Sequence, residues 1–155
     1  METKHNSFSI RQLSLMSGLT DRTIRNYIAS GILQGEKSDG VWSFSPEQVR
    51  NFFYHPAVRP SILAKQNAIV YDFLQDGRKK NCEICMILDL PEKNKREIME
   101  YFCSRISSED FDSIHFSFDG TGSTARIILK GRIHEVLDLV NGYTEKYLSP
   151  TQVKV

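Results

Sequence analysis

Long hydrophobic runs, an even number of cysteines and a strong net charge are all missing from this sequence of 155 residues. No apolar run approaches the roughly 20 residues that a helix needs to cross a bilayer. Residues 1–6 contain no apolar segment of the kind found in signal peptides. The three cysteines are an odd number, which does not suit a disulfide framework. These absences predict a cytoplasmic protein without a membrane partner.

The composition is that of an ordinary globular protein, with 40% apolar and 25% charged residues. The net charge of +1 conceals a difference between the two parts of the chain. Residues 1–66 carry eight Lys or Arg against five Asp or Glu, whereas residues 67–155 carry twelve against fourteen. DNA binding requires a local basic face rather than a basic protein, and the first part can supply such a face.

Two helix starts lie close together near the N-terminus. Ser9 and Gln12 form an S-x-x-Q capping box, and the helix that they begin is expected to end at Gly18. Thr20 caps a second helix, which we expect to end at Gly31. A short turn that contains glycine separates the two helices, and this arrangement predicts a helix-turn-helix.

A hairpin and a third helix are predicted directly after the helix-turn-helix. Residues 32–34 and 41–44 are β-prone, and the polar loop between them ends in an Asp-Gly pair, which is typical of a hairpin. Ser45 then caps a third helix that has proline in its first turn. Helix, turn, helix, hairpin and helix in this order predict a winged helix-turn-helix domain over residues 7–56.

The remainder of the chain predicts a connector and a second domain. Residues 57–80 form the connector, with a helix from about residue 61 to residue 76. Beyond it the order of elements is strand, helix, strand, strand and helix, which is typical of the ferredoxin-like split pattern. The expected fold class is therefore α+β, with a ferredoxin-like sandwich domain over residues 81–155. The expected strands lie at 83–90, 114–118 and 125–129, with a further short strand at 151–155, and the last helix at 133–148.

Six short stretches of the first domain keep the order and spacing of a known motif. They are Phe8-Ser9-Ile10-Arg11-Gln12-Leu13, Ser17-Gly18-Leu19-Thr20, Thr23-Ile24-Arg25-Asn26-Tyr27, Gly31-Ile32-Leu33, Gly40 with Phe44, and Ser45-Pro46-Glu47. In these stretches, which span about a third of the chain, the protein resembles the DNA-binding domain of the MerR family of bacterial regulators. The resemblance implies a DNA-binding transcriptional regulator.

The sequence departs from the MerR pattern in the wing and after it. The family's wing usually has Tyr-Arg after its glycine, and that arginine meets a phosphate, whereas Val41 and Trp42 follow Gly40 here. The G-x-W-x-F form is closer to the excisionase-type domains of phage and mobile elements. Many family members also dimerise through a long antiparallel coiled-coil helix, but the helix expected from residue 61 has only about sixteen residues.

The second helix of the motif is expected to lie in the major groove, which is about 12 Å wide. Arginine suits two-point contact with a guanine or a phosphate, and hydroxyl groups fix the register on phosphates. The simpler alternative is that Arg22 and Arg25 form an ordinary solvated helix face and that Trp42 packs beneath the wing. The predicted DNA-binding residues are Arg11, Thr20, Arg22, Thr23, Arg25, Asn26, Tyr27, Lys37 and Trp42.

Cysteine provides little that predicts a metal site or an active site. Cys82 and Cys85 form a C-x-x-C pair, but zinc normally takes four ligands and only Cys103 remains. Residues three apart in a strand point to opposite faces, so we expect packing roles, with a thiol sensor as the alternative. No nucleophile, base and orienting group form a recognisable set. We therefore predict no metal, no cofactor and no enzyme activity.

The leading hypothesis is a sequence-specific, MerR-like transcriptional regulator that binds double-stranded DNA as a homodimer. A dimer can recognise a palindrome whose half-sites lie about one helical turn apart. The domain over residues 81–155 is expected to serve dimerisation or regulation, and the identity of any small-molecule effector is left open. Two alternatives also remain open: an excisionase-like architectural factor that bends DNA, and a protein-interaction module that has lost DNA binding.

Overall fold

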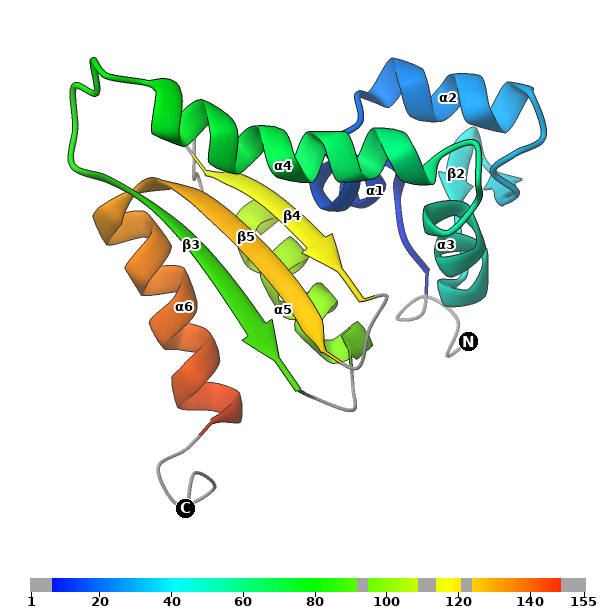
Figure 1. Ribbon diagram of the computed structural model, residues 1–155. Coiled ribbons are helices and arrows are strands. Elements are labelled where there is room, and N and C mark those ends of the chain that lie inside the picture. The colour runs from blue at the N-terminus through cyan, green and yellow to red at the C-terminus, as the bar shows by residue number, and fades with distance from the viewer. Residues whose placement is uncertain (1–6, 92–94, 109–113, 121–123, 149–155) are drawn as a thin grey trace.

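The computed structural model describes residues 7–91, 95–108, 114–120 and 124–148. These residues form a mixed α+β fold with six helices and two small antiparallel sheets (Figure 1). No helix in these ranges is both long and apolar enough to span a membrane. In chain order the elements are α1 (Ile10–Ser17), α2 (Asp21–Ala29), β1 (Glu36–Ser38), β2 (Val41–Ser43), α3 (Pro46–Phe53), α4 (Arg59–Gln75), β3 (Glu83–Leu90), α5 (Lys95–Ser108), β4 (His115–Asp119), β5 (Ala125–Arg132) and α6 (Ile133–Tyr147).

Side-chain caps begin α1 and α2, and a left-handed glycine separates them. The Ser9 hydroxyl accepts from the Gln12 amide at 3.1 Å, and the Gln12 side chain accepts from the Ser9 amide at 2.9 Å. Gly18 follows α1 with a φ of 78°, a conformation that a side chain disfavours. Thr20 accepts from the Thr23 amide at 3.1 Å and begins α2. The two helix starts that the sequence predicted are confirmed.

The hairpin turns on two residues. Strands β1 and β2 are antiparallel, with Ser38 opposite Val41, so that only Asp39 and Gly40 lie between them. Both turn residues have positive φ, at 53° and 78°. Two consecutive positive φ values match the twist of the flanking strands, and Asp-Gly is a preferred pair for such a turn.

The predicted first strand of this hairpin, at residues 32–34, is wrong. The amides of Ile32 and Leu33 both donate to the Tyr27 carbonyl, at 3.0 and 3.1 Å. The chain therefore folds back onto the end of α2 and buries Leu33 in the core. The last carbonyls of a helix have no hydrogen-bond donor within the helix. The Ile32 and Leu33 amides satisfy one of them here, and they therefore do not pair in a strand, although their side chains favour one. The strand forms later, at β1.

The third helix starts where the sequence predicted, and the fourth starts earlier. Ser45 and Gln48 form the predicted capping box of α3, with hydrogen bonds of 3.1 and 2.9 Å. Helix α4 begins at Arg59, two residues before the predicted start at 61. Proline is compatible with the first turn of a helix because the amide that it lacks would have no partner there. Pro60 therefore lies inside α4 rather than before its first residue.

The larger sheet has the strand order β3-β5-β4, and both pairings are antiparallel. Strand β3 covers the predicted residues 83–90, and β4 is shifted by one residue from its prediction. Strand β5 continues beyond its predicted end to Arg132, where it pairs with Glu83 at the start of β3. The short strand predicted at 151–155 lies outside the described residues.

Helices cover both faces of this sheet. Along β5, Ile127 and Leu129 are fully buried on the side of α5 and α6. On the other face α4 crosses the sheet, and Ile128 is buried there (Figure 1). Helix α1 lies beside β4 and also contacts α4 and α5. One hydrophobic cluster therefore includes residues from both the N-terminal and the C-terminal part of the chain.

Two glycines with similar backbone geometry offer a matched test of the contact between α1 and α4. Gly18 and Gly31 have φ values of 78° and 82°, but a Cβ at Gly18 would lie 2.9 Å from the Lys65 Cβ, whereas nothing lies within 4 Å of one at Gly31. We expect Gly31→Ala to lower the free energy of unfolding by about 1 kcal/mol through backbone strain. Gly18→Ala should cost about 1–3 kcal/mol more because α4 must move. Urea denaturation measures both, and equal losses would contradict the packing argument.

Candidate nucleic-acid interface

Helix α2 presents a polar face to solvent. Ile24 holds the helix to the core and is fully buried. Arg22, Arg25 and Asn26 are all exposed, and their spacing places them on one side of the helix. Helix α2 lies at the outside of the molecule, on the far side of α4 from the sheet (Figure 1). The structure thus brings together the three long polar side chains of the predicted recognition helix.

The two arginines of this face differ in their partners. The Arg25 Nε donates to an Asp21 carboxylate oxygen at 2.9 Å, and the two side chains are 57% and 61% exposed. An exposed pair of this spacing contributes only about 0.3–0.5 kcal/mol, so a phosphate or a base can replace Asp21 at little cost. Arg22 has no hydrogen bond or ion pair within the described part of the chain. Both guanidinium groups are therefore accessible to a ligand.

The remaining predicted residues of α2 have structural partners. The Thr20 hydroxyl donates to the Thr23 hydroxyl at 2.9 Å, while also capping the helix. The Tyr27 ring meets Phe52 of α3 edge-to-face, with ring centroids 5.5 Å apart. Tyr27 therefore holds α2 against α3. Whether these three side chains also contact DNA stays a prediction.

The β1–β2 hairpin, which is the predicted wing, carries one cation beside its aromatic residues. The Lys37 ammonium lies over the Trp42 ring, 5.7 Å from its centroid. The Trp42 ring is partly buried and stacks on Phe44 with centroids 6.3 Å apart. Arg11 is exposed on α1. The predicted DNA-binding residues thus lie on α1, on α2 with its N-cap, and on the two strands of the hairpin.

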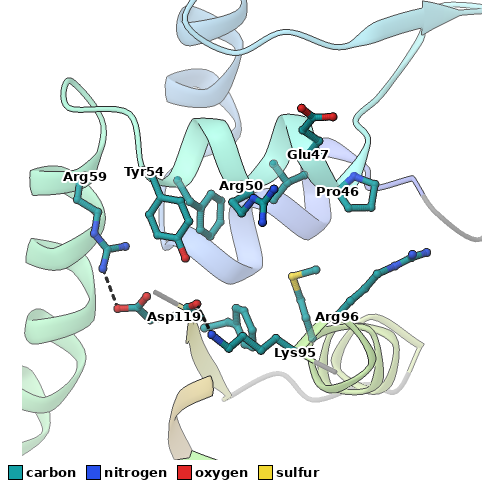
Figure 2. Close-up of a pocket in the computed structure, with 13 residues that line it drawn as sticks. Pro46, Glu47, Arg50, Tyr54, Arg59, Lys95, Arg96 and Asp119 are labelled. Carbon is teal, nitrogen blue, oxygen red and sulfur yellow. Dashed lines mark hydrogen bonds and ion pairs between the residues drawn. The ribbon is translucent and has the colours of Figure 1, made fainter. Parts of the chain in front are cut away.

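A cleft of about 690 Å³ lies between α3 and the start of α5 (Figure 2). Its apolar wall consists of Val49, Phe53, Met99 and Phe118. Around that wall stand four cationic side chains and two carboxylates, Arg50, Arg59, Lys95, Arg96, Glu47 and Asp119.

Two contacts hold the edge of the cleft that the start of α4, the start of α5 and the end of β4 form. Arg59 donates to Asp119 at 2.9 Å, and their side chains are 21% and 15% exposed. The Lys95 Nζ donates to the Gly120 carbonyl, also at 2.9 Å. The pair Arg59–Asp119 joins the start of α4 to the end of β4, and the lysine contact joins α5 to the same corner. The rim is therefore held by residues from three separate elements.

Tyr54 adds a neutral polar group to the cleft. The Arg59 guanidinium lies 5.7 Å from the centroid of its ring. Burial raises the pKa of the Tyr54 phenol, and the nearby Asp119 carboxylate raises it further. The hydroxyl therefore stays protonated at neutral pH and can donate a hydrogen bond.

The sequence did not predict this cleft. Its residues come from α3 and the start of α4 and, more than thirty positions later, from α5 and the end of β4. No local motif joins these two groups, because only the tertiary structure places α3 opposite α5 and β4. The available signal was the pair Arg50 and Tyr54, which are four residues apart on α3 and therefore share a face.

The three cysteines lie in very different surroundings. Cys82 is exposed, Cys85 is half-buried with a pKa raised by burial, and Cys103 is fully buried with a pKa raised by burial to about 12. Among the described residues, no three His, Cys, Asp or Glu side chains gather in a way that could hold a metal ion.

No protein-family model matches this chain, and no curated protein or solved structure is significantly similar to it. Three surface features of the chain itself therefore bear on its function: the exposed face of α2, the β1–β2 hairpin and the cleft.

The thiols should react in the order of their exposure. With 5,5′-dithiobis(2-nitrobenzoate) at pH 8, we expect Cys82 to react first and Cys85 more slowly. Cys103 should react only after denaturation, because a pKa of about 12 leaves it almost no thiolate and burial blocks the reagent. Cys82→Ser should remove the fast phase. A fast phase that persists in this variant would show that Cys85 is more accessible than its burial indicates.

Proposed function

We propose that this chain is a sequence-specific DNA-binding transcriptional regulator of the MerR-like kind, in which residues 7–56 act as a winged helix-turn-helix. The observation that carries the proposal is the exposed face of α2, with Arg22, Arg25 and Asn26 side by side directly after the turn. Arginine contacts guanine and asparagine contacts adenine, each through two hydrogen bonds. These residue types therefore suit base recognition as well as phosphate binding.

The order and size of the N-terminal elements support this proposal. Helices α1 and α2 are separated by residues 18–20, and β1, β2 and α3 follow in the order of a winged domain. Helix α2 has nine residues, and an α-helix about 10–12 Å across with its side chains fits a major groove about 12 Å wide. The hairpin tip at Asp39 is exposed and can approach the DNA backbone beside the helix.

We propose a ferredoxin-like arrangement for the second part of the chain. Its supporting observation is the element order β3, α5, β4, β5, α6 together with the strand order β3-β5-β4. In the split pattern the third strand likewise lies between the first and the second. This part would serve regulation, or support a dimer formed through the preceding helix, rather than contact bases.

We further propose that the regulator acts as a homodimer through the exposed side of α4. Leu63, Tyr71 and Leu74 are 39%, 62% and 72% exposed, although all three are large and apolar. Their spacing along a helix of 17 residues places them along one side. A second copy of α4 laid across this stripe would remove these side chains from water.

The recognition helix can be tested by alanine substitution. We expect Arg25→Ala and Arg22→Ala each to weaken binding to a duplex selected from random sequences by about 1–3 kcal/mol, or roughly 5- to 150-fold in Kd. Arg78→Ala is the matched control, because Arg78 is exposed beyond the far end of α4. Fluorescence anisotropy at a stated salt concentration measures all three.

The selection itself separates the alternatives. A palindromic sequence with a steep dependence of affinity on salt supports a dimeric regulator. A strongly bent, loosely specified site would favour the excisionase-like factor. Recovery of nothing above background, or an Arg25→Ala variant that binds as tightly as the parent, would overturn base recognition and favour the protein-interaction module.

The dimer surface predicts a change of mass in solution. We expect Leu74→Glu to convert the dimer to a monomer, because each copy would place a charge against an apolar partner surface. Light scattering coupled to size exclusion measures the mass, and Gln75→Glu controls for added charge next to the stripe. A dimer that persists in Leu74→Glu at micromolar concentration would place the interface elsewhere.

A further inference from the structure

We propose that the cleft between α3 and α5 is a binding site for a small organic acid, one carboxylate on an apolar body, and that its occupancy is transmitted to α2 and the wing. The proposed binding site is argued only from the residues that line the cleft. The consequence for DNA binding rests on the proposed function.

The lining of the cleft matches an amphipathic anion in size and chemistry. Ligand pockets commonly measure about 300–1,000 Å³ and combine an apolar wall with a few converging polar groups. The cleft, at about 690 Å³, has such a wall and an excess of cations over carboxylates. An apolar body would cover Phe53, Met99 and Phe118, while the charge would face the cationic rim.

Arg50 is the side chain best suited to receive the carboxylate. The other cations of the cleft already have partners: Arg59 pairs with Asp119 and Lys95 with Gly120, while Arg96 pairs with Glu100 at 3.0 Å. Arg50 forms no hydrogen bond or ion pair within the described part of the chain. Figure 2 shows Arg50 and Tyr54 extending from α3 on the side that faces Lys95 and Asp119.

The two carboxylates of the lining limit the charge of the ligand. Asp119 stands beside Arg59, and Glu47 lies one turn before Arg50 on α3. A phosphate group would bring nearly two negative charges toward these side chains, whereas a carboxylate brings one. The protonated Tyr54 hydroxyl can donate a second hydrogen bond to a carboxylate held by Arg50. The surroundings therefore favour a monocarboxylate.

Helix α3 offers a direct route from the cleft to α2. Phe53 lines the cleft, and its neighbour Phe52 contacts it edge-to-face at 5.9 Å. Phe52 also holds Tyr27 of α2 at 5.5 Å. A ligand that draws α3 toward α5 must therefore change the packing under α2. The wing is coupled as well, because Phe44, which stacks on Trp42, lies just two residues before Pro46 of the cleft.

A charged and a neutral version of one small molecule test the binding site without DNA. We expect 4-phenylbutyrate to bind the full chain at least ten-fold more tightly than 4-phenylbutanamide at low salt, as measured by isothermal titration calorimetry. Arg50→Gln should weaken binding of the acid at least five-fold, and Arg50→Lys should restore part of it by returning the charge. Arg78→Gln should have no effect. Equal binding of the acid and the amide, or an unchanged affinity in Arg50→Gln, overturns the site.

The proposed effect of a bound ligand on the β1–β2 hairpin can also be measured without DNA. Trp42 is the single tryptophan of the chain and lies in the wing, so its emission reports on that segment. We expect saturating 4-phenylbutyrate to shift this emission in the parent protein and not in Arg50→Gln at the same concentration. Binding by calorimetry without any change in emission overturns transmission while the site stands. A change in emission with no effect on the affinity for a selected duplex would overturn the consequence for DNA binding, whereas a chain that binds no duplex at all would overturn the proposed function and leave the ligand site standing.

Discussion

The ion pair between Arg59 and Asp119 joins parts of the chain that are sixty residues apart. Both side chains are largely shielded from water, so their attraction is less screened than that of a surface pair. The pair places the start of α4 against the end of β4. Because α3 runs directly into α4, it also places α3 over α5. Together with the hydrogen bond from Lys95 to the Gly120 carbonyl, this pair sets the geometry of the cleft.

Helix α3 connects the two candidate sites. One of its faces carries Phe52 and supports Tyr27 of α2, and another carries Arg50 and Tyr54 toward the cleft. A helix with two functional faces can couple two sites only if its own position can change. In the proposed coupling, the open cleft leaves room for α3 to move toward α5. The contact between Phe52 and Tyr27 would pass that movement on to α2. A shift of α3 in this coupling would move the β1–β2 hairpin and α2 together.

The local elements of the N-terminal part were largely predictable, and the reason is capping. The capping boxes at Ser9 and Ser45 involve residues only three apart, so the sequence contains all the information that each helix start needs. The first strand of the hairpin was predicted at residues 32–34 instead of β1, because the demand of the α2 terminus for donors is invisible in a propensity pattern. Of the candidate DNA-binding residues, those on α2 could be chosen from their spacing, and Arg22, Arg25 and Asn26 are indeed exposed together.

The sequence by itself determined the capped starts of α1, α2 and α3, the hairpin turn at Asp39 and the span of β3, because each has a signal in residues that are neighbours in the chain. Tertiary structure alone decided which cations line the cleft, which partner each one has, and that α3 lies between α2 and α5. Those facts depend on contacts between residues tens of positions apart, such as Arg59 and Asp119. Such contacts leave no periodic trace in a single sequence, since either partner alone resembles an ordinary surface charge.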